Sequence, residues 1–92
     1  MNVRFYATFR ALVGAKNAEF LIPDGTTVRG LLSEIIRRYP SLEPELLDEK
    51  RELHRHVHVL INGRDTYYLP QKMETVLEEQ DTVDIFPPVA GG

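Results

Sequence analysis

Short runs of hydrophobic residues along the chain predict the strands of a small sheet. In the first run, residues 2–9, Val3, Phe5 and Ala7 alternate with other side chains, which is the period of a half-buried strand. Further strands are expected at residues 18–22, 56–61 and 82–86, with a short return strand at 66–69. Asn62-Gly63 between two of them is typical of a hairpin turn.

An amphipathic helix is the clearest predicted element. After Thr27, a suitable N-cap, apolar residues recur at helical spacing: Val28, Leu31, Leu32, Ile35 and Ile36. Tyr39-Pro40 ends this helix, because a proline pushes the residue before it out of helical angles. Residues 11–17 are expected to form a connection that turns at Gly14. Pro44 suits the start of a short second helix, and residues 73–79 a single helical turn.

The order of these elements predicts an α+β fold in which one main helix packs on one face of a mixed sheet of four or five strands. Residues 1–86 would form one domain. Pro87-Pro88 stops sheet pairing, because neither residue carries a backbone donor, so residues 87–92 are expected to form a flexible tail.

Composition narrows the classes of function. The 92 residues include no Cys, which excludes disulfides, thiolate metal sites and a cysteine nucleophile. A net charge of −3 disfavours nucleic acid as the main partner. No apolar run approaches the ~20 residues that a membrane span needs, and no leader precedes the first strand, so a cytoplasmic protein without membrane contact is expected. We expect no bound cofactor and no catalytic side chain.

The chain after the last strand suggests chemistry on a backbone carboxylate. It reads Pro87-Pro88-Val89-Ala90-Gly91-Gly92, so a semi-rigid stem precedes small residues that could enter a narrow channel. A carboxylate at Gly92 is a poor electrophile, but an adenylyl group from ATP would activate it. A sulfur donor could then attack, which would leave a thiocarboxylate.

The last seven residues, FPPVAGG, resemble the terminus of the MoaD/ThiS family of ubiquitin-like sulfur carriers. The FYATFR segment at 5–10, the Thr-Val helix start and the VDI strand at 83–85 are also similar to that family. The resemblance implies a β-grasp fold and a non-enzymatic carrier. An ATP-dependent, MoeB/ThiF-like enzyme would adenylate Gly92 before thiocarboxylation. In the MoaD branch the tail then enters the MoaE-like large subunit of molybdopterin synthase and donates sulfur to the pterin precursor.

Two departures leave the sulfur acceptor open. Glu79-Gln80-Asp81 replaces the Asp-Gly-Asp turn usual before the last strand, and residues 41–58 form a longer segment than in short family members. Within it, residues 52–56 resemble CysO-like carriers for cysteine biosynthesis and SAMP-like archaeal modifiers. The alternatives to molybdopterin synthesis are therefore another thiolation pathway or a ubiquitin-like modifier that forms isopeptide bonds through Gly92.

Other side chains are candidates for partner or metal contacts. Tyr6, Leu60 and Phe86 face away from the inferred core and are expected to form an apolar interface patch. If the third strand extends back to His54, then His54, His56 and His58 share one face, where they could bind zinc or simply contact solvent.

The charged residues are expected mainly at the surface. Arg10, Arg64 and Lys72 would be solvated or would pair with a partner. Asp65 is interpreted as a turn residue. A late acidic group is expected to steer a basic partner or to keep the protein soluble: Glu74, Glu78, Glu79, Asp81 and Asp84.

Overall fold

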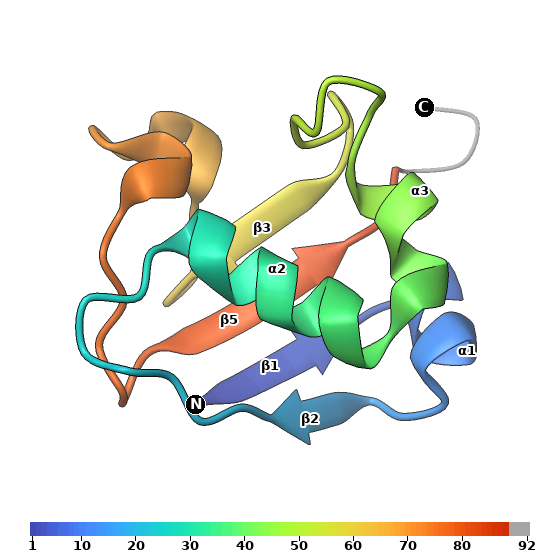
Figure 1. The fold of residues 1–92 in the computed structure, drawn as a ribbon, viewed down its shortest axis with the longest axis horizontal. Coiled ribbons are helices and arrows are strands. Elements are labelled where there is room, and N and C mark those ends of the chain that lie inside the picture. The colour runs from blue at the N-terminus through green and yellow to red at the C-terminus, as the bar shows by residue number, and fades with distance from the viewer. Residues whose placement is uncertain (89–92) are drawn as a thin grey trace.

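The structure is a computed structural model that describes residues 1–88 (Figure 1). A five-stranded sheet with the order β2-β1-β5-β3-β4 forms its base. The central strands β1 and β5 are parallel, and the other neighbouring pairs are antiparallel, so the sheet is mixed as predicted. The strands are β1 (Asn2–Phe5), β2 (Asn17–Glu19), β3 (His58–Ile61), β4 (Arg64–Asp65) and β5 (Thr82–Phe86).

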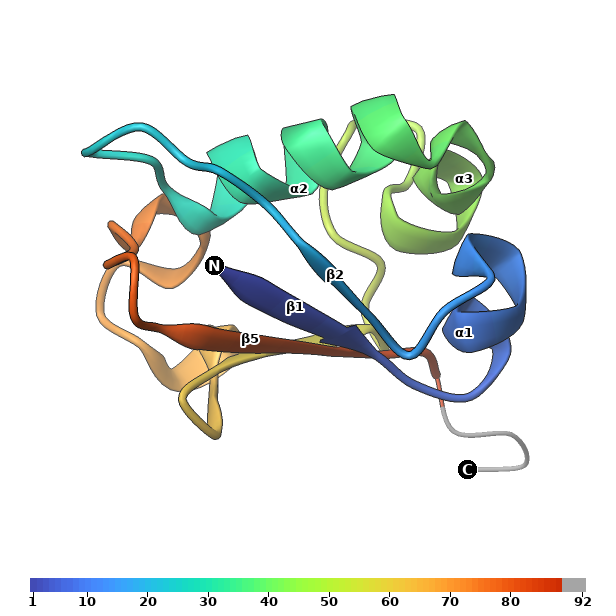
Figure 2. The ribbon, with the colours of Figure 1, turned by 90° about the horizontal axis from the view of Figure 1, so that it is seen from below.

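Helix α2 (Val28–Arg38) crosses one face of this sheet (Figures 1 and 2). As predicted, Thr27 caps it: the Thr27 hydroxyl oxygen accepts a hydrogen bond from the Gly30 amide at 3.1 Å. The helix ends at Arg38, and Tyr39, the residue before Pro40, is its C-cap. Two shorter helices, α1 (Thr8–Val13) and α3 (Glu43–Leu46), lie near its C-terminal end. Within residues 1–88, no helix is both long and apolar enough to span a bilayer.

The hydrophobic core lies between α2 and the sheet. The predicted apolar stripe of α2 is buried, and it packs on alternate residues of the three middle strands. These inward-facing strand residues are Val3, Phe5, Val59, Ile61, Val83 and Ile85. Leu42 and Leu46, which follow α2 in the chain, are also fully buried. The alternating apolar residues that predicted these strands are therefore the ones that face α2.

The first predicted strand is too long. The chain turns after β1, and Ala7, expected to face the core from residues 2–9, is exposed at φ 52° and ψ −128°. The amide of Phe9 donates to the Tyr6 carbonyl oxygen at 3.1 Å, and α1 follows where a connection was expected. This turn carries Phe9 into the core, where it is 1 % exposed. Gly14, in the left-handed conformation at φ 83°, ends α1 and is the predicted turn residue.

The strand predicted at residues 82–86 matches β5 in both bounds, and two other strand predictions are correct in place but not in length. The second strand occupies 17–19 rather than 18–22, and the third begins at His58 rather than at residue 56. Asn62 and Gly63 both have positive φ and form a tight turn, so the return strand starts at once with β4. The predicted strand at 66–69 is instead a 3₁₀ helix, Thr66–Tyr68, because the Asp65 carboxylate accepts a hydrogen bond from the Tyr67 amide.

Two short helical segments complete the chain. A 3₁₀ helix at Pro40–Leu42 leads into α3, which contains Pro44 in its first turn as expected. The helical turn predicted at residues 73–79 is a 3₁₀ helix at Lys72–Glu74. Val76 is extended instead and forms a β-bridge with Thr27 at the start of α2, which ends the helical conformation early.

Candidate functional site

The sheet face opposite α2 holds the candidate site. Figure 2 shows the labelled helices above the sheet and the chain leaving β5 toward the other side. Alternation along β1 and β5 directs Arg4 and Asp84 to this outer face, and the register of the two parallel strands places these residues directly opposite each other. Tyr6, Leu60 and Phe86 are half-buried on the same side of the molecule.

An apolar hollow brings together the three residues predicted to form an interface patch. The rings of Tyr6 and Phe86 stack with centroids 4.1 Å apart and an angle of 10° between their planes. Leu60 borders the same hollow, which has a volume of about 530 Å³. Its full lining is Tyr6, Ala7, Thr8, His58, Leu60, Phe86, Pro87 and Pro88. The structure therefore groups these side chains as expected, and their role at an interface stays a prediction.

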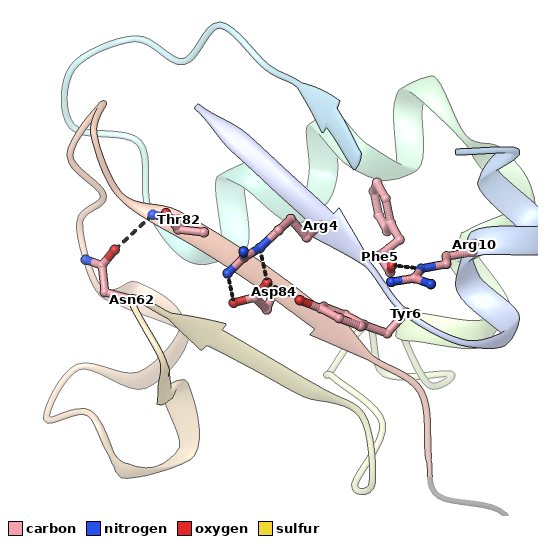
Figure 3. Close-up of polar contacts among 7 residues, drawn as sticks. All are labelled: Arg4, Phe5, Tyr6, Arg10, Asn62, Thr82 and Asp84. Atoms are coloured by element: carbon pink, nitrogen blue, oxygen red, sulfur yellow. Dashed lines mark hydrogen bonds and ion pairs between the residues drawn. The ribbon is translucent and has the colours of Figure 1, made fainter. Parts of the chain in front are cut away.

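A buried carboxylate, that of Asp84, binds Tyr6, one of the residues that line this hollow; Figure 3 shows the contacts of the carboxylate. Asp84 is only 6 % exposed. Its Oδ2 accepts a hydrogen bond from Arg4 Nη2 at 2.9 Å, its Oδ1 accepts another from Arg4 Nε, and the Tyr6 hydroxyl donates to Oδ1 at 2.8 Å. The expectation that Asp84 belongs to a solvated acidic group is therefore wrong, because both of its oxygens are bound within the molecule.

These contacts raise the pKa values of both partners of Asp84. The pKa of Tyr6 is above its ordinary value, chiefly because its hydroxyl donates to the carboxylate and also because burial disfavours the phenolate. The pKa of Arg4 is raised mainly by its hydrogen bonds to Asp84, and the attraction between the opposite charges adds to the effect. Tyr6 therefore remains a hydrogen-bond donor at neutral pH.

Arg10 borders the aromatic pair from α1. Its Nε donates to the carbonyl oxygen of Phe5 at 2.8 Å, and its guanidinium carbon lies 5.2 Å from the centre of the Tyr6 ring. These two contacts fix the Arg10 side chain beside the apolar hollow. Arg10 therefore places a positive charge next to the surface where a partner is expected.

Strained backbone borders the hollow at Ala7. Its φ of 52° and ψ of −128° match a turn position that glycine normally occupies, because a side chain there clashes with the backbone. A non-glycine residue in such a conformation costs roughly 1–3 kcal/mol and persists only when its surroundings enforce it. Ala7 follows Tyr6 and lines the hollow, so the strain lies at the candidate site.

The tail prediction is only partly within the described residues. Phe86 is the last residue of β5, and the hollow is lined by Phe86, Pro87 and Pro88 in succession. The chain therefore leaves the sheet beside the candidate interface. Val89, Ala90, Gly91 and Gly92 lie outside the described residues, so the flexible tail and the reactive carboxyl group of Gly92 stay predictions.

The three histidines do not share a strand face. Since β3 starts at His58, the condition for the zinc hypothesis is not met. His54 Nε2 lies 2.9 Å from the Pro44 carbonyl oxygen, and His58 Nδ1 lies 2.7 Å from Asp65 Oδ2. Across residues 1–88, no three His, Asp or Glu side chains are grouped so as to hold a metal ion.

Several charges expected to meet solvent or a partner have contacts within the chain. Lys72 Nζ donates to the Tyr67 carbonyl oxygen at 2.7 Å and lies over the Tyr67 ring. Glu74 pairs with Arg29 at 2.7 Å. Asp81 accepts hydrogen bonds from the Asn62 side chain and from the Glu78 amide. The predicted acidic group is thus divided among local contacts, and Glu78, Glu79 and Arg64 are exposed.

The last strand, β5, lies at the centre of the mixed sheet and runs parallel to β1, and α2 crosses one face of the sheet. This arrangement defines a small ubiquitin-like domain of the β-grasp class. The model of the ThiS family matches residues 3–92, and the chain belongs to this family of ubiquitin-like sulfur carriers. The predicted family and fold are thereby confirmed.

Three relatives show the range of the family. The chain is 40% identical to small archaeal modifier protein 3 of Haloferax volcanii, over the whole chain and 98% of the relative. It is 26% identical to the molybdopterin synthase sulfur carrier subunit of Arabidopsis thaliana, over the whole chain and 82% of the relative. Its fold is similar to a chain in the crystal structure of the Amycolatopsis orientalis BexX/CysO complex, with a TM-score of 0.82, 28% identity and coverage of 99% and 98%.

Proposed function

We propose that this protein carries sulfur as a thiocarboxylate at the carboxyl group of Gly92. One observation carries the proposal within the family: the apolar hollow and the start of the tail share Phe86, Pro87 and Pro88. An enzyme that docks on the hollow would therefore receive the chain segment that leads to Gly92.

The chemistry needs no catalytic group on the carrier. A carboxylate oxygen of Gly92 attacks the α-phosphorus of ATP, pyrophosphate leaves, and an acyl-adenylate forms. A sulfur donor at the level of hydrosulfide then attacks the acyl carbon, and AMP leaves with the bonding electrons of the broken C–O bond. The product is a thiocarboxylate, and an ATP-dependent activating enzyme of the MoeB/ThiF-like kind would catalyse both steps.

The outer face supplies the recognition in this proposal. Tyr6, Leu60 and Phe86 would accept apolar side chains of the activating enzyme, since half-buried aromatic and aliphatic groups around a hollow are typical interface anchors. Arg10 at the border would meet a carboxylate or a backbone carbonyl group of that enzyme. The same face would later contact the enzyme that accepts the sulfur.

For the sulfur acceptor we propose the large subunit of molybdopterin synthase, a MoaE-like protein. The similarity to the Arabidopsis thaliana sulfur carrier subunit supports this choice. The likeness to the chain in the BexX/CysO complex supports a carrier for another thiolation pathway, with cysteine biosynthesis as the alternative. All of these acceptors would use the same activated Gly92.

A second candidate function is protein modification through Gly92. The 40% identity to small archaeal modifier protein 3 favours it. In this case a lysine amine of a target protein attacks the activated acyl carbon and forms an isopeptide bond. Such adducts would survive both denaturation and reductant on a gel, whereas a thiocarboxylate carrier would migrate like the unmodified protein.

The exchange of labelled pyrophosphate into ATP by the activating enzyme tests the first step. We expect exchange to depend on this protein and to vanish when Gly91 and Gly92 are deleted. Leu60→Asp should weaken binding, because it places a charge in the apolar hollow. Leu21→Asp is the matched control, since Leu21 is 95 % exposed and does not line the hollow. Full pyrophosphate exchange with the truncated chain would contradict the proposal. An equal loss of binding to the activating enzyme in Leu60→Asp and Leu21→Asp would also contradict it.

A further inference from the structure

We infer that Asp84 is a positioning residue for the docking surface, which acts by holding the Tyr6 ring against Phe86. The inference rests on the proposed function, because the surface concerned is the one that the activating enzyme would bind. Asp84 would keep this surface in its binding shape before the enzyme arrives. The group involved is the carboxylate, together with the Arg4 guanidinium that neutralises it and the Tyr6 hydroxyl that it binds.

The position of Tyr6 shows why its ring needs an anchor. Tyr6 follows the last residue of β1, and Ala7 then bends the chain away from the sheet. The sheet ladder thus ends at Phe5, one residue before the aromatic side chain that forms a wall of the hollow. The hydrogen bond from the Tyr6 hydroxyl to Asp84 Oδ1 restores a link between this side chain and the sheet.

The same hydrogen bond connects Tyr6 to the strand that leads into the tail. Asp84 and Phe86 are two residues apart on β5, so their side chains project from the same face. The carboxylate holds the outer end of the Tyr6 ring while Phe86 stacks on its plane. Two contacts from one strand therefore fix the ring.

A purely structural role explains the network less well. A buried carboxylate is costly to desolvate, and replacing a buried ion pair by apolar residues often stabilises a protein. The covered face of the sheet already provides the hydrophobic core, with Val83 and Ile85 fully buried on either side of Asp84. The stability of the fold therefore does not require a carboxylate at position 84, because an apolar residue there would suffice. The carboxylate instead binds the hydroxyl group of a side chain in the hollow.

Steady-state kinetics of adenylation by the activating enzyme, with this protein as the varied substrate, tests the inference. The variants are Asp84→Asn, Tyr6→Phe and the double variant. Loss of this internal hydrogen bond would free the Tyr6 ring from the position that the enzyme binds, so we expect the KM to rise about tenfold with kcat unchanged. The double variant should show little further change, because Tyr6→Phe removes the same hydrogen bond that Asp84→Asn weakens by taking away the charge of its acceptor.

Asn62→Ala is the matched control for lost stability. Asn62 bonds the Asp81 side chain and, as Figure 3 shows, the Thr82 amide at the opposite end of β5, so its loss weakens the fold away from the hollow. We expect this variant to unfold at lower urea concentration than the wild type but to keep the wild-type KM. Ring NMR shifts of Tyr6 and Phe86 in the free proteins should move in Asp84→Asn and stay constant in Asn62→Ala.

The outcomes separate the inference from the function on which it rests. If the wild type is not adenylated, the proposed function fails and the inference fails with it. If the wild type is adenylated and Leu60→Asp raises KM, but Asp84→Asn and Tyr6→Phe keep the wild-type KM, only the inference is overturned. It is likewise overturned if Asn62→Ala raises KM as much as Asp84→Asn does, because lost stability would then explain the effect.

Discussion

The two faces of one sheet are organised on different principles. On the covered face, Phe5 and Ile85 are fully buried and contribute by the apolar area that they remove from water, which has no preferred direction. On the outer face, the neighbouring residues Arg4 and Asp84 form hydrogen bonds with fixed geometry, and Tyr6 stacks on Phe86. The covered face is built for stability and the outer face for a defined surface, so changes on the two faces should affect different measurements.

The largest expected effect comes from the covered face. Phe5→Ala should lower the free energy of unfolding by about 3–5 kcal/mol, because it removes a large buried ring and leaves a cavity. Leu60→Asp, on the half-buried outer face, should lower it by less than about 1 kcal/mol. Urea unfolding followed by circular dichroism measures both values. Equal losses would show that the two faces do not differ as described.

A smaller effect of opposite sign is expected at Ala7. Ala7→Gly removes the strain of a positive φ, while the added chain freedom of the unfolded state offsets part of the gain. We expect a net stabilisation of about 1 kcal/mol in the same urea experiment. Gly14→Ala is a useful contrast, since it introduces a side chain at φ 83° and should destabilise the protein. A destabilised Ala7→Gly variant would argue against strain at this turn.

The most subtle effect is the pH dependence of Tyr6. Its pKa is raised in the folded protein, so its hydrogen bond contributes fully below the unfolded pKa of about 10 and is lost as the pH rises through the higher folded pKa. Titration of ¹³C-labelled tyrosine rings by NMR should show Tyr6 ionising at higher pH than a free tyrosine. Asp84→Asn should move its pKa downward, because the carboxylate is the main cause of the shift. An unchanged Tyr6 titration in that variant would contradict the network.

The sequence predicted the covered face more completely than the outer one. Alternation and helical spacing were enough to identify the buried residues of the strands and of α2, because each repeats within one element. The same alternation also placed Tyr6, Leu60 and Phe86 opposite the core, and the structure groups them around one hollow. Local pattern therefore predicts which side of an element a residue faces.

The partners on that side depend on strand register, which a local pattern does not contain. Arg4 and Asp84 are 80 residues apart, and only the parallel pairing of β1 with β5 brings them together. Helix α1 was missed for a different reason: the turn before it contains Ala7 at positive φ, where a glycine would have been the usual signal. The four-residue spacing of Phe9 and Val13, followed by Gly14, was the one helical signal available in that segment.

The central claim is that the carboxyl group of Gly92 becomes a thiocarboxylate, and intact-mass spectrometry tests it most directly. The protein is incubated with the activating enzyme, ATP and a sulfur source, and the product is fragmented to locate the change. The account predicts a mass increase of about 16 Da, from the replacement of one oxygen by sulfur, located on Gly92. An unchanged mass, or the same increase in a chain that lacks Gly91 and Gly92, would contradict it.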